Sequence, residues 1–225
     1  MPDRRAFNES PLVFLSKPES RWVRHEACVW NGPGDRNKVL KLEKLQRRYS
    51  DCKRLFCDLL GVKPADTKHV VEELCYITDE DDVPVQRFKD VICLLAHYHS
   101  TRSSLSEAQI EKIRLAPVFP ILEEGHGTSE ESSISWRSLS DGGWYIPDKT
   151  MLEIAFRGRV DLLSLPRKEL SRKEVRTLDD LFEALRCRDM FISANVEVDI
   201  EPRGSPIPDE SREDDLKTRL RYILQ

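Results

Sequence analysis

Side chains that could act as a nucleophile, a general base or a general acid occur along the whole chain, but in no known catalytic arrangement. Nucleophilic catalysis needs a Ser or Cys with a His within hydrogen-bonding reach, and the five histidines lie in no local signature of this kind. No G-x-S-x-G segment occurs either. Adjacent carboxylates, as at Glu72–Glu73 and Asp214–Asp215, are typical of solvated surfaces rather than of an acid–base pair. We therefore predict that the protein is not an enzyme.

Metal and nucleotide sites also lack their sequence signatures. The six cysteines form no C-x-x-C pair, and a helix would place His97 and His99, two residues apart, on opposite sides. Neither G-x-G-x-x-G nor G-x-x-x-x-G-K-[ST] is present. Asp141-Gly142-Gly143 instead indicates a hairpin turn between two strands. We expect no cofactor and no metal.

Composition limits the classes of protein that remain. A length of 225 residues fits one or two domains. The net charge of −4 excludes a globally basic nucleic-acid binder but leaves local basic patches open. No apolar run is long enough for a signal peptide or a membrane span. We expect an intracellular protein of the cytoplasm or nucleus, without a membrane partner and with reduced cysteines.

One basic stretch could contact nucleic acid. Residues 36–54 carry eight Lys and Arg against two acids, and the stretch includes Tyr49. The candidate contacts are Lys44, Arg47 and Arg48. The alternative is a pair of helices with basic polar faces, which the acidic run at 72–82 favours. A second basic cluster at 167–176 is most simply a solvated connection.

Hydrophobic spacing predicts helices in the first half of the chain. They cover 37–49, a segment from Ser50 that ends before Gly61, a segment capped by Asp66 or Thr67, and one that begins near Pro84. A fifth helix follows the capping box formed by Ser106 and Gln109. Residues 1–34 are expected to be extended or partly disordered, and 35–114 to be helical.

The second half, 115–225, reads as a mixture of strands and helices. Short strands are predicted at 115–122 (short or at an edge, because of its two prolines), 133–139, 144–146, 160–165 and 191–200. Helices are predicted after Asp148 and after Thr177, and a last one over 209–224. The predicted fold class is therefore α+β, with a helical N-terminal half and a mixed α/β half that contains a small sheet.

The last predicted helix carries a regular apolar stripe. Its members are Leu216, Leu220, Ile223 and Leu224. Such a stripe either binds a partner or packs on the chain's own strands. We predict that Leu216→Asp with Leu220→Asp abolishes self-association in the first case and unfolds the chain in the second. Size-exclusion chromatography and circular dichroism separate the two cases, and no change in either would contradict both.

The order of several segments resembles the large fungal proteins related to sacsin and to the plant protein No Vein. The segments are CVWNGP (28–33), YSDCKRLFCDLLGV (49–62), VVEEL (70–74), LAPVFPI (115–121), WYIPDK (144–149) and FRGRVDLLSL (156–165). LRCRDMFISANVEV (185–198) resembles the helix–strand element that follows in that group, and DDLKTRLRYILQ (214–225) resembles a helix that continues onward there.

In that group these segments lie downstream of a GHKL-type, histidine-kinase-like ATPase module. The acidic-to-asparagine helix motif and the glycine-bearing ATP lid of the module have no counterpart here, so the resemblance carries over no functional residue. It implies a middle segment of a chaperone-like or scaffold protein, present as a fragment or split product. Our first hypothesis is therefore a non-catalytic structural or protein-interaction segment, whose partner is another protein or the missing flanking domains. Nucleic-acid binding through 36–54 is the second hypothesis.

Overall fold

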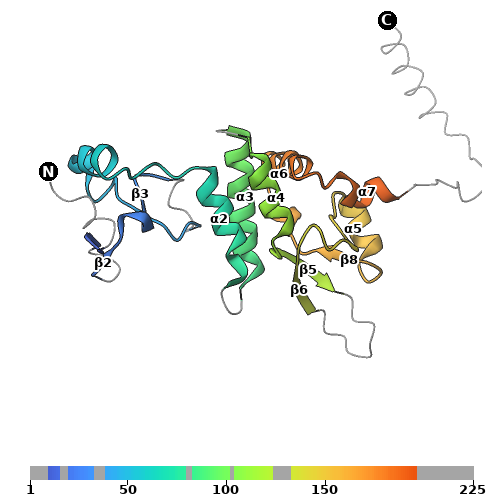
Figure 1. The fold of residues 1–225 in the computed structure, drawn as a ribbon. Coiled ribbons are helices and arrows are strands. Elements are labelled where there is room, and N and C mark those ends of the chain that lie inside the picture. The colour runs from blue at the N-terminus through green and yellow to red at the C-terminus, as the bar shows by residue number, and fades with distance from the viewer. Residues whose placement is uncertain are drawn as a thin grey trace, which may run out of the picture. The chain divides into compact units, whose positions relative to one another are not determined.

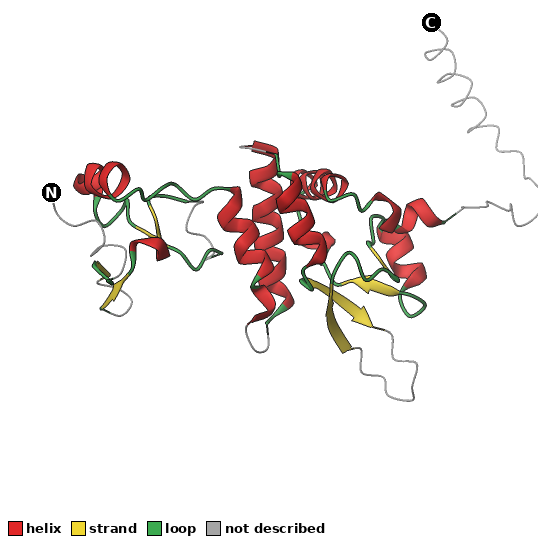
Figure 2. Ribbon diagram, in the orientation of Figure 1, coloured by secondary structure: helices red, strands yellow, loops and turns green. Residues whose placement is uncertain are grey.

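A computed structural model describes residues 10–15, 20–32, 39–79, 83–101, 104–123 and 133–196. Its helices and small sheets form an α+β fold, which confirms the predicted class (Figure 1; Figure 2). The stripe Leu216, Leu220, Ile223 and Leu224, the helix predicted over 209–224 and residues 197–200 lie outside the described residues. The structure therefore does not test those predictions.

Three helices in the middle of the chain agree with the predictions. They are α2 (Thr67–Cys75), α3 (Val85–Thr101) and α4 (Glu107–Leu115), and the 3-10 turn η4 (Ile77–Asp79) follows α2. Asp66 caps α2, and Ser106 and Gln109 form the capping box of α4, because each side-chain oxygen accepts an otherwise unpaired backbone N–H. α3 packs against α2 and α6 (Arg172–Ala184) (Figure 1).

A four-stranded sheet packs beside these helices. Its order is β6 (Ser133–Arg137), β5 (Phe119–Glu123), β8 (Asp161–Leu163) and β7 (Trp144–Tyr145). β5 is antiparallel to both of its neighbours, and β7 is parallel to β8. β5 is as short as predicted but lies inside the sheet, not at an edge. Pro120 is tolerated there because proline lacks only the N–H, and its carbonyl accepts the Ser164 N–H at 2.8 Å.

The helices and the sheet share one buried cluster, here called the main core. Its largest fully buried side chains include Phe88 and Tyr98 from α3, Phe119 from β5, Trp144 from β7 and Phe182 from α6. Residues from both halves that the sequence distinguishes, 35–114 and 115–225, contribute to this cluster.

Residues 10–64 contain short elements around a smaller cluster. β1 (Val13–Leu15) pairs antiparallel with β2 (Arg21–Val23), and β3 (Cys28–Val29) pairs parallel with β4 (Glu43–Lys44). η1 (His25–Ala27) and η2 (Ser50–Cys52) are 3-10 turns, and η3 (Arg54–Leu59) is a π-helix. The buried members, here called the N-terminal core, are Val13, Leu15, Cys28, Trp30, Leu45, Phe56 and Val62.

The helix predicted over 37–49 is wrong. Within the described part of that segment the chain forms β4 and a turn at 46–48. Its apolar residues serve two cores, because Leu40 is buried in the main core and Leu45 in the N-terminal core. The helix predicted from Ser50 is present only as η2 and η3, and Gly61 follows it with a φ of 74°.

Asp141-Gly142-Gly143 is a turn, but the predicted hairpin is wrong. β6 and β7, which flank the turn, are not paired, because β5 and β8 lie between them. The turn is held by Ser138: its N–H donates to Asp141 Oδ2 at 2.7 Å, and its carbonyl accepts the indole N–H of Trp144 at 3.2 Å. Both glycines have φ near +70° (65° and 72°), a conformation that costs glycine little.

Asp148 does not cap the helix that follows it. α5 (Thr150–Phe156) forms as predicted and is followed by Gly158 at φ 83°, but its N-cap is Lys149 and has no side-chain bond. Asp148 instead accepts the N–H of Ser193 at 3.1 Å and also the Ser193 hydroxyl. It therefore holds the first turn of α7 (Ile192–Asn195).

The strand predicted over 191–200 is wrong across 192–195, which form α7. Within 191–196, the part of this segment that the structure describes, only Phe191 pairs as in a sheet, through a parallel bridge to Ile146. The alternation of apolar residues there is also compatible with one helical turn that buries Ile192. The 3-10 turn η6 (Arg188–Met190) precedes this helix.

Helix α6, which was predicted after Thr177, begins earlier than predicted. α6 starts after Ser171, whose hydroxyl accepts the Glu174 N–H while Glu174 bonds back to the Ser171 N–H. The predicted start at Thr177 lies inside the helix, and the Thr177 hydroxyl donates to the Glu174 carbonyl. η5 (Arg167–Glu169) precedes it. Leu178, Leu181 and Phe182 of α6 are fully buried.

Candidate functional site

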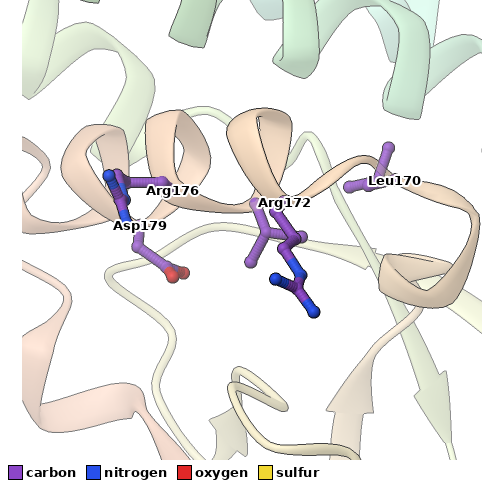
Figure 3. A pocket seen from close by; sticks show the side chains of 5 residues that line it. Leu170, Arg172, Arg176 and Asp179 are labelled. Carbon is purple, nitrogen blue, oxygen red and sulfur yellow. The ribbon is translucent and has the colours of Figure 1, made fainter.

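An open groove follows the first turns of α6. It has a volume of about 400 Å³ and is lined by Leu170, Arg172, Val175, Arg176 and Asp179. Figure 3 shows the side chains of Arg172 and Asp179 on the same side of the helix. Opposite charges along one exposed wall can bind a charged side chain of a partner, but they offer no arrangement for catalysis. We call this feature the α6 groove.

A buried guanidinium contacts Asp179, one of the residues that line the α6 groove. Arg167 is only 9% exposed, and its Nη2 donates to Asp179 Oδ1 at 2.5 Å. Its Nη1 is buried without a hydrogen-bond partner among the described residues. A buried polar atom of this kind costs free energy. The prediction that the basic cluster at 167–176 is a solvated connection is therefore wrong for Arg167.

A second cavity lies in the N-terminal part and is more polar. Its volume is about 440 Å³, and its lining residues are Trp30, Asn31, Gln46, Ser50, Lys53, Cys57, Val62, Lys63 and Pro64. Backbone bonds join its walls: Trp30 N–H donates to Lys63 O at 2.9 Å, and Gln46 N–H donates to Trp30 O at 2.8 Å. We call it the N-terminal pocket.

The structure places the three predicted nucleic-acid contacts beside this pocket rather than on a helix. Lys44 is half-buried in β4, with its side chain against Gly32. Arg47 and Arg48 are exposed on the turn at 46–48. None of the three lines the pocket, whereas Lys53 and Lys63 do. Sequence reasoning missed Lys63 because it lies outside the basic stretch and reaches the pocket through tertiary structure.

α5 presents an uncovered apolar face. Met151 is 77% exposed and Ile154 is 59% exposed, and α5 buries none of its residues. Residues three and four apart share a helix face, so Ala155, also exposed, extends it. We call Met151, Ile154 and Ala155 the α5 apolar face. The sequence predicted the helix but not this face, because apolar residues in a short amphipathic helix are normally expected to be buried.

A charged network links three strands of the four-stranded sheet. Arg137 of β6 bonds Glu123 of β5 at 2.6 Å and Asp161 of β8 at 3.1 Å. The Ser135 hydroxyl and the Arg137 guanidinium hold the pKa of Glu123 below its usual value. Since one arginine joins three strands and satisfies both carboxylates, the network aligns strands rather than offering a free acid or base.

Three of the six thiols are poorly suited to nucleophilic chemistry. Burial raises the pKa of Cys187 to about 12 and that of Cys28 and Cys93 to about 11, so these thiols stay protonated near neutral pH. Among the described residues no group of three or more His, Cys, Asp or Glu side chains could hold a metal ion. No helix in the described part of the chain is long and apolar enough to cross a bilayer.

The closest His–carboxylate contact is structural. His69 Nδ1 lies 2.6 Å from Asp66 Oδ1, as in a catalytic dyad. However, the pair forms the capping box of α2, because the Asp66 N–H donates to His69 Nδ1 and the His69 N–H donates to Asp66. A role in closing the helix end accounts for both side chains.

Comparison with known proteins gives one match. The model of a family described as "Domain of unknown function (DUF8348)" matches residues 68–196, which is more than half of the chain. No curated protein and no solved structure matches the chain. The matched range extends from the start of α2 to the end of α7 and contains both the α6 groove and the α5 apolar face.

Proposed function

The chain belongs to the DUF8348 family, and we propose that its family region, 68–196, is a non-catalytic module that binds another protein through the α5 apolar face. The observation that carries the proposal is the exposure of Met151 and Ile154 on a helix that buries no residue. Transfer of one such side chain from water into an interface is worth about 1.5–3 kcal/mol. The two together are enough to anchor a contact.

The exposed side of α6 differs from the exposed side of α5. The exposed residues of α6 include Arg172, Lys173, Arg176, Asp180 and Glu183, all of them charged. A helix that only meets solvent would be expected to resemble α6. α5, in contrast, exposes Met151, Ile154 and Ala155, and its single acid, Glu153, pairs with Arg157 at 2.5 Å.

α5 is also held firmly enough to be a binding element. It follows β7, which pairs with β8, and it packs against α7. α7 in turn is fixed by Asp148 and by the backbone bond from Ile192 N–H to Ile146 O at 3.1 Å. An interface on a rigid element loses little conformational entropy when the partner binds.

The resemblance to sacsin-related and No Vein-like proteins supports the same proposal. Two of the resembling segments, 144–149 and 156–165, lie directly before and at the end of α5. We propose that the chain is a segment of a scaffold-like assembly in the cytoplasm or nucleus, and that α5 contacts a flanking domain or a separate protein of that assembly.

Substitution of the α5 apolar face tests the proposal. Met151→Lys with Ile154→Lys is expected to reduce the affinity for the partner at least tenfold. The free energy of unfolding should change by about 0.5 kcal/mol or less, because both positions are exposed. The measurements are quantitative co-purification of the tagged full chain from its host cells and urea unfolding of the purified variant.

The matched control is Asp180→Asn with Glu183→Gln, which adds the same net charge of +2 on the exposed side of α6. It should retain every partner that the wild type binds. Equal loss of partners in both variants would contradict a specific α5 interface. Unfolding of the lysine variant would show that the face is covered within the chain.

A further inference from the structure

We propose that the N-terminal part, residues 10–64, binds single-stranded nucleic acid, with Lys53 and Lys63 of the N-terminal pocket holding a phosphate and Trp22 with Phe14 stacking on a base. This activity is separate from the protein binding assigned to α5, and it uses Lys53 and Lys63 in place of Lys44, Arg47 and Arg48, the contacts that the sequence suggested.

Charge is distributed unevenly along the chain. Residues 1–64 carry 14 Lys and Arg against 8 Asp and Glu, whereas 65–225 carry 22 against 32. The first part therefore has a net charge of +6 within a chain of −4. Attraction to phosphates is local in physiological salt, because charges are screened over about 8 Å. A basic part can therefore bind a polyanion although the whole chain is acidic.

The N-terminal pocket has the groups that a nucleotide requires. Lys53 and Lys63 line it and form no ion pair within the described part of the chain. Asn31 and Gln46 add amides that can both donate and accept hydrogen bonds. The volume of about 440 Å³ lies within the range of small-ligand sites.

The acidic groups near the pocket do not neutralise the positive charge of Lys53 and Lys63. Asp51 is the acid next to the pocket-lining Ser50, and it accepts the Ser50 hydroxyl at 3.0 Å. Glu43 pairs with Arg21 at 3.0 Å. Neither carboxylate lines the pocket, and neither does Asp58, which follows the pocket-lining Cys57. The two lysines therefore determine the charge of its walls.

An exposed aromatic pair lies on the same small core. Phe14 of β1 and Trp22 of β2 are direct cross-strand neighbours with ring centroids 5.1 Å apart. They are 37% and 59% exposed, while Val13 and Leu15 on the opposite side of β1 are buried. Exposed rings of this kind stack on bases of any sequence.

Tyr49 connects the aromatic pair to the pocket. Its hydroxyl donates to the Phe14 carbonyl, its ring packs on Phe56 at 5.1 Å, and its neighbour Ser50 lines the pocket. A ligand that uses both features needs several linked nucleotides, which favours a strand over a free nucleotide. The longest regular helix in the described part of 10–64 is the six-residue η3, so this part has no long helix of the kind that reads a duplex groove.

The test is fluorescence anisotropy of a labelled single-stranded oligonucleotide with the full chain, over a range of salt concentrations. Lys53→Glu with Lys63→Glu should weaken binding at least tenfold and reduce the slope of log K against log salt by about 0.7, as the loss of one phosphate contact requires. Trp22→Ala should weaken binding about tenfold with little change in that slope, because stacking is not ionic.

The matched control is Arg172→Glu with Arg176→Glu, which makes the same change of −4 in net charge on α6 and should bind as the wild type does. Equal weakening by this control would overturn the assignment to the N-terminal pocket. Equal affinity for a mononucleotide would overturn the assignment to a strand, and equal affinity for polyglutamate would overturn the stacking contribution. Absence of binding at low salt would overturn the proposal altogether, whatever the result for α5.

Discussion

Trp144→Ala is expected to lower the free energy of unfolding by about 3–5 kcal/mol, the usual cost of truncating a large buried aromatic side chain. Trp144 is 1% exposed and its ring packs on Phe119 with centroids 5.7 Å apart. Its indole N–H also donates a hydrogen bond to the Ser138 carbonyl, and this bond closes the turn after β6. The substitution removes core volume and this bond together.

Urea unfolding followed by circular dichroism measures the effect. Trp22→Ala is the matched control, because Trp22 is 59% exposed and should change the free energy of unfolding by no more than about 1 kcal/mol. If both substitutions cost the same, Trp144 would not be the centre of the main core. Many domains are stable by only about 5–15 kcal/mol, so Trp144→Ala is expected to leave the fold close to its limit.

Asp179→Ala is expected to destabilise the protein by about 2–3 kcal/mol, because it leaves the guanidinium of Arg167 without its carboxylate. Arg167 is 9% exposed and already has one unpaired nitrogen. Breaking a fully buried ion pair costs about 3–5 kcal/mol. The Asp179 carboxylate is 41% exposed, so water can enter and the cost falls below that range.

The informative comparison is the double variant Arg167→Met with Asp179→Ala. Replacement of a buried charge by an apolar side chain of similar length removes the desolvation cost, so this variant should be at least as stable as Asp179→Ala and close to the wild type. Urea unfolding midpoints give the order. A double variant less stable than Asp179→Ala would contradict this account. It would show that the Arg167 guanidinium stabilises the fold through more than its bond to Asp179.

Local signals predicted most of the helices and strands between Thr67 and Ala184. Asp66 for α2 and Ser106 with Gln109 for α4 are visible in the sequence because a capping box involves residues only three apart. The apolar positions of α3 were predicted for the same reason, since Phe88, Val91 and Leu95 follow the period of one helix. Strand β6 and the core of β8 also agree with the predicted strands.

The wrong predictions share a non-local cause. Leu40 and Leu45 resemble a helical stripe, but one belongs to the main core and the other to the N-terminal core. The turn at 141–143 cannot close a hairpin because β8, which comes later in the chain, pairs with β7. Asp148 bonds Ser193, 45 residues away, instead of the helix beside it. No pattern within a short window contains this information.

The candidate site was predictable only in part. The basic stretch at 36–54 contains some of the residues that line the N-terminal pocket, but Lys63 and Asn31 line it from outside that stretch. The α5 apolar face exists because no other part of the chain that the structure describes covers Met151 and Ile154, and the sequence alone does not show this. Both surfaces therefore required the tertiary structure.

The most direct test of the central claim, that α5 is a protein-binding surface, is site-specific photo-cross-linking in living host cells. A photoreactive amino acid at position 151 should give a discrete cross-linked product of higher mass, and the same amino acid at position 180, which is also exposed but lies on α6, should give none. Ile154→Lys should remove the product at 151. A chain that yields no product at 151, or equal products at 151 and 180, would contradict the account.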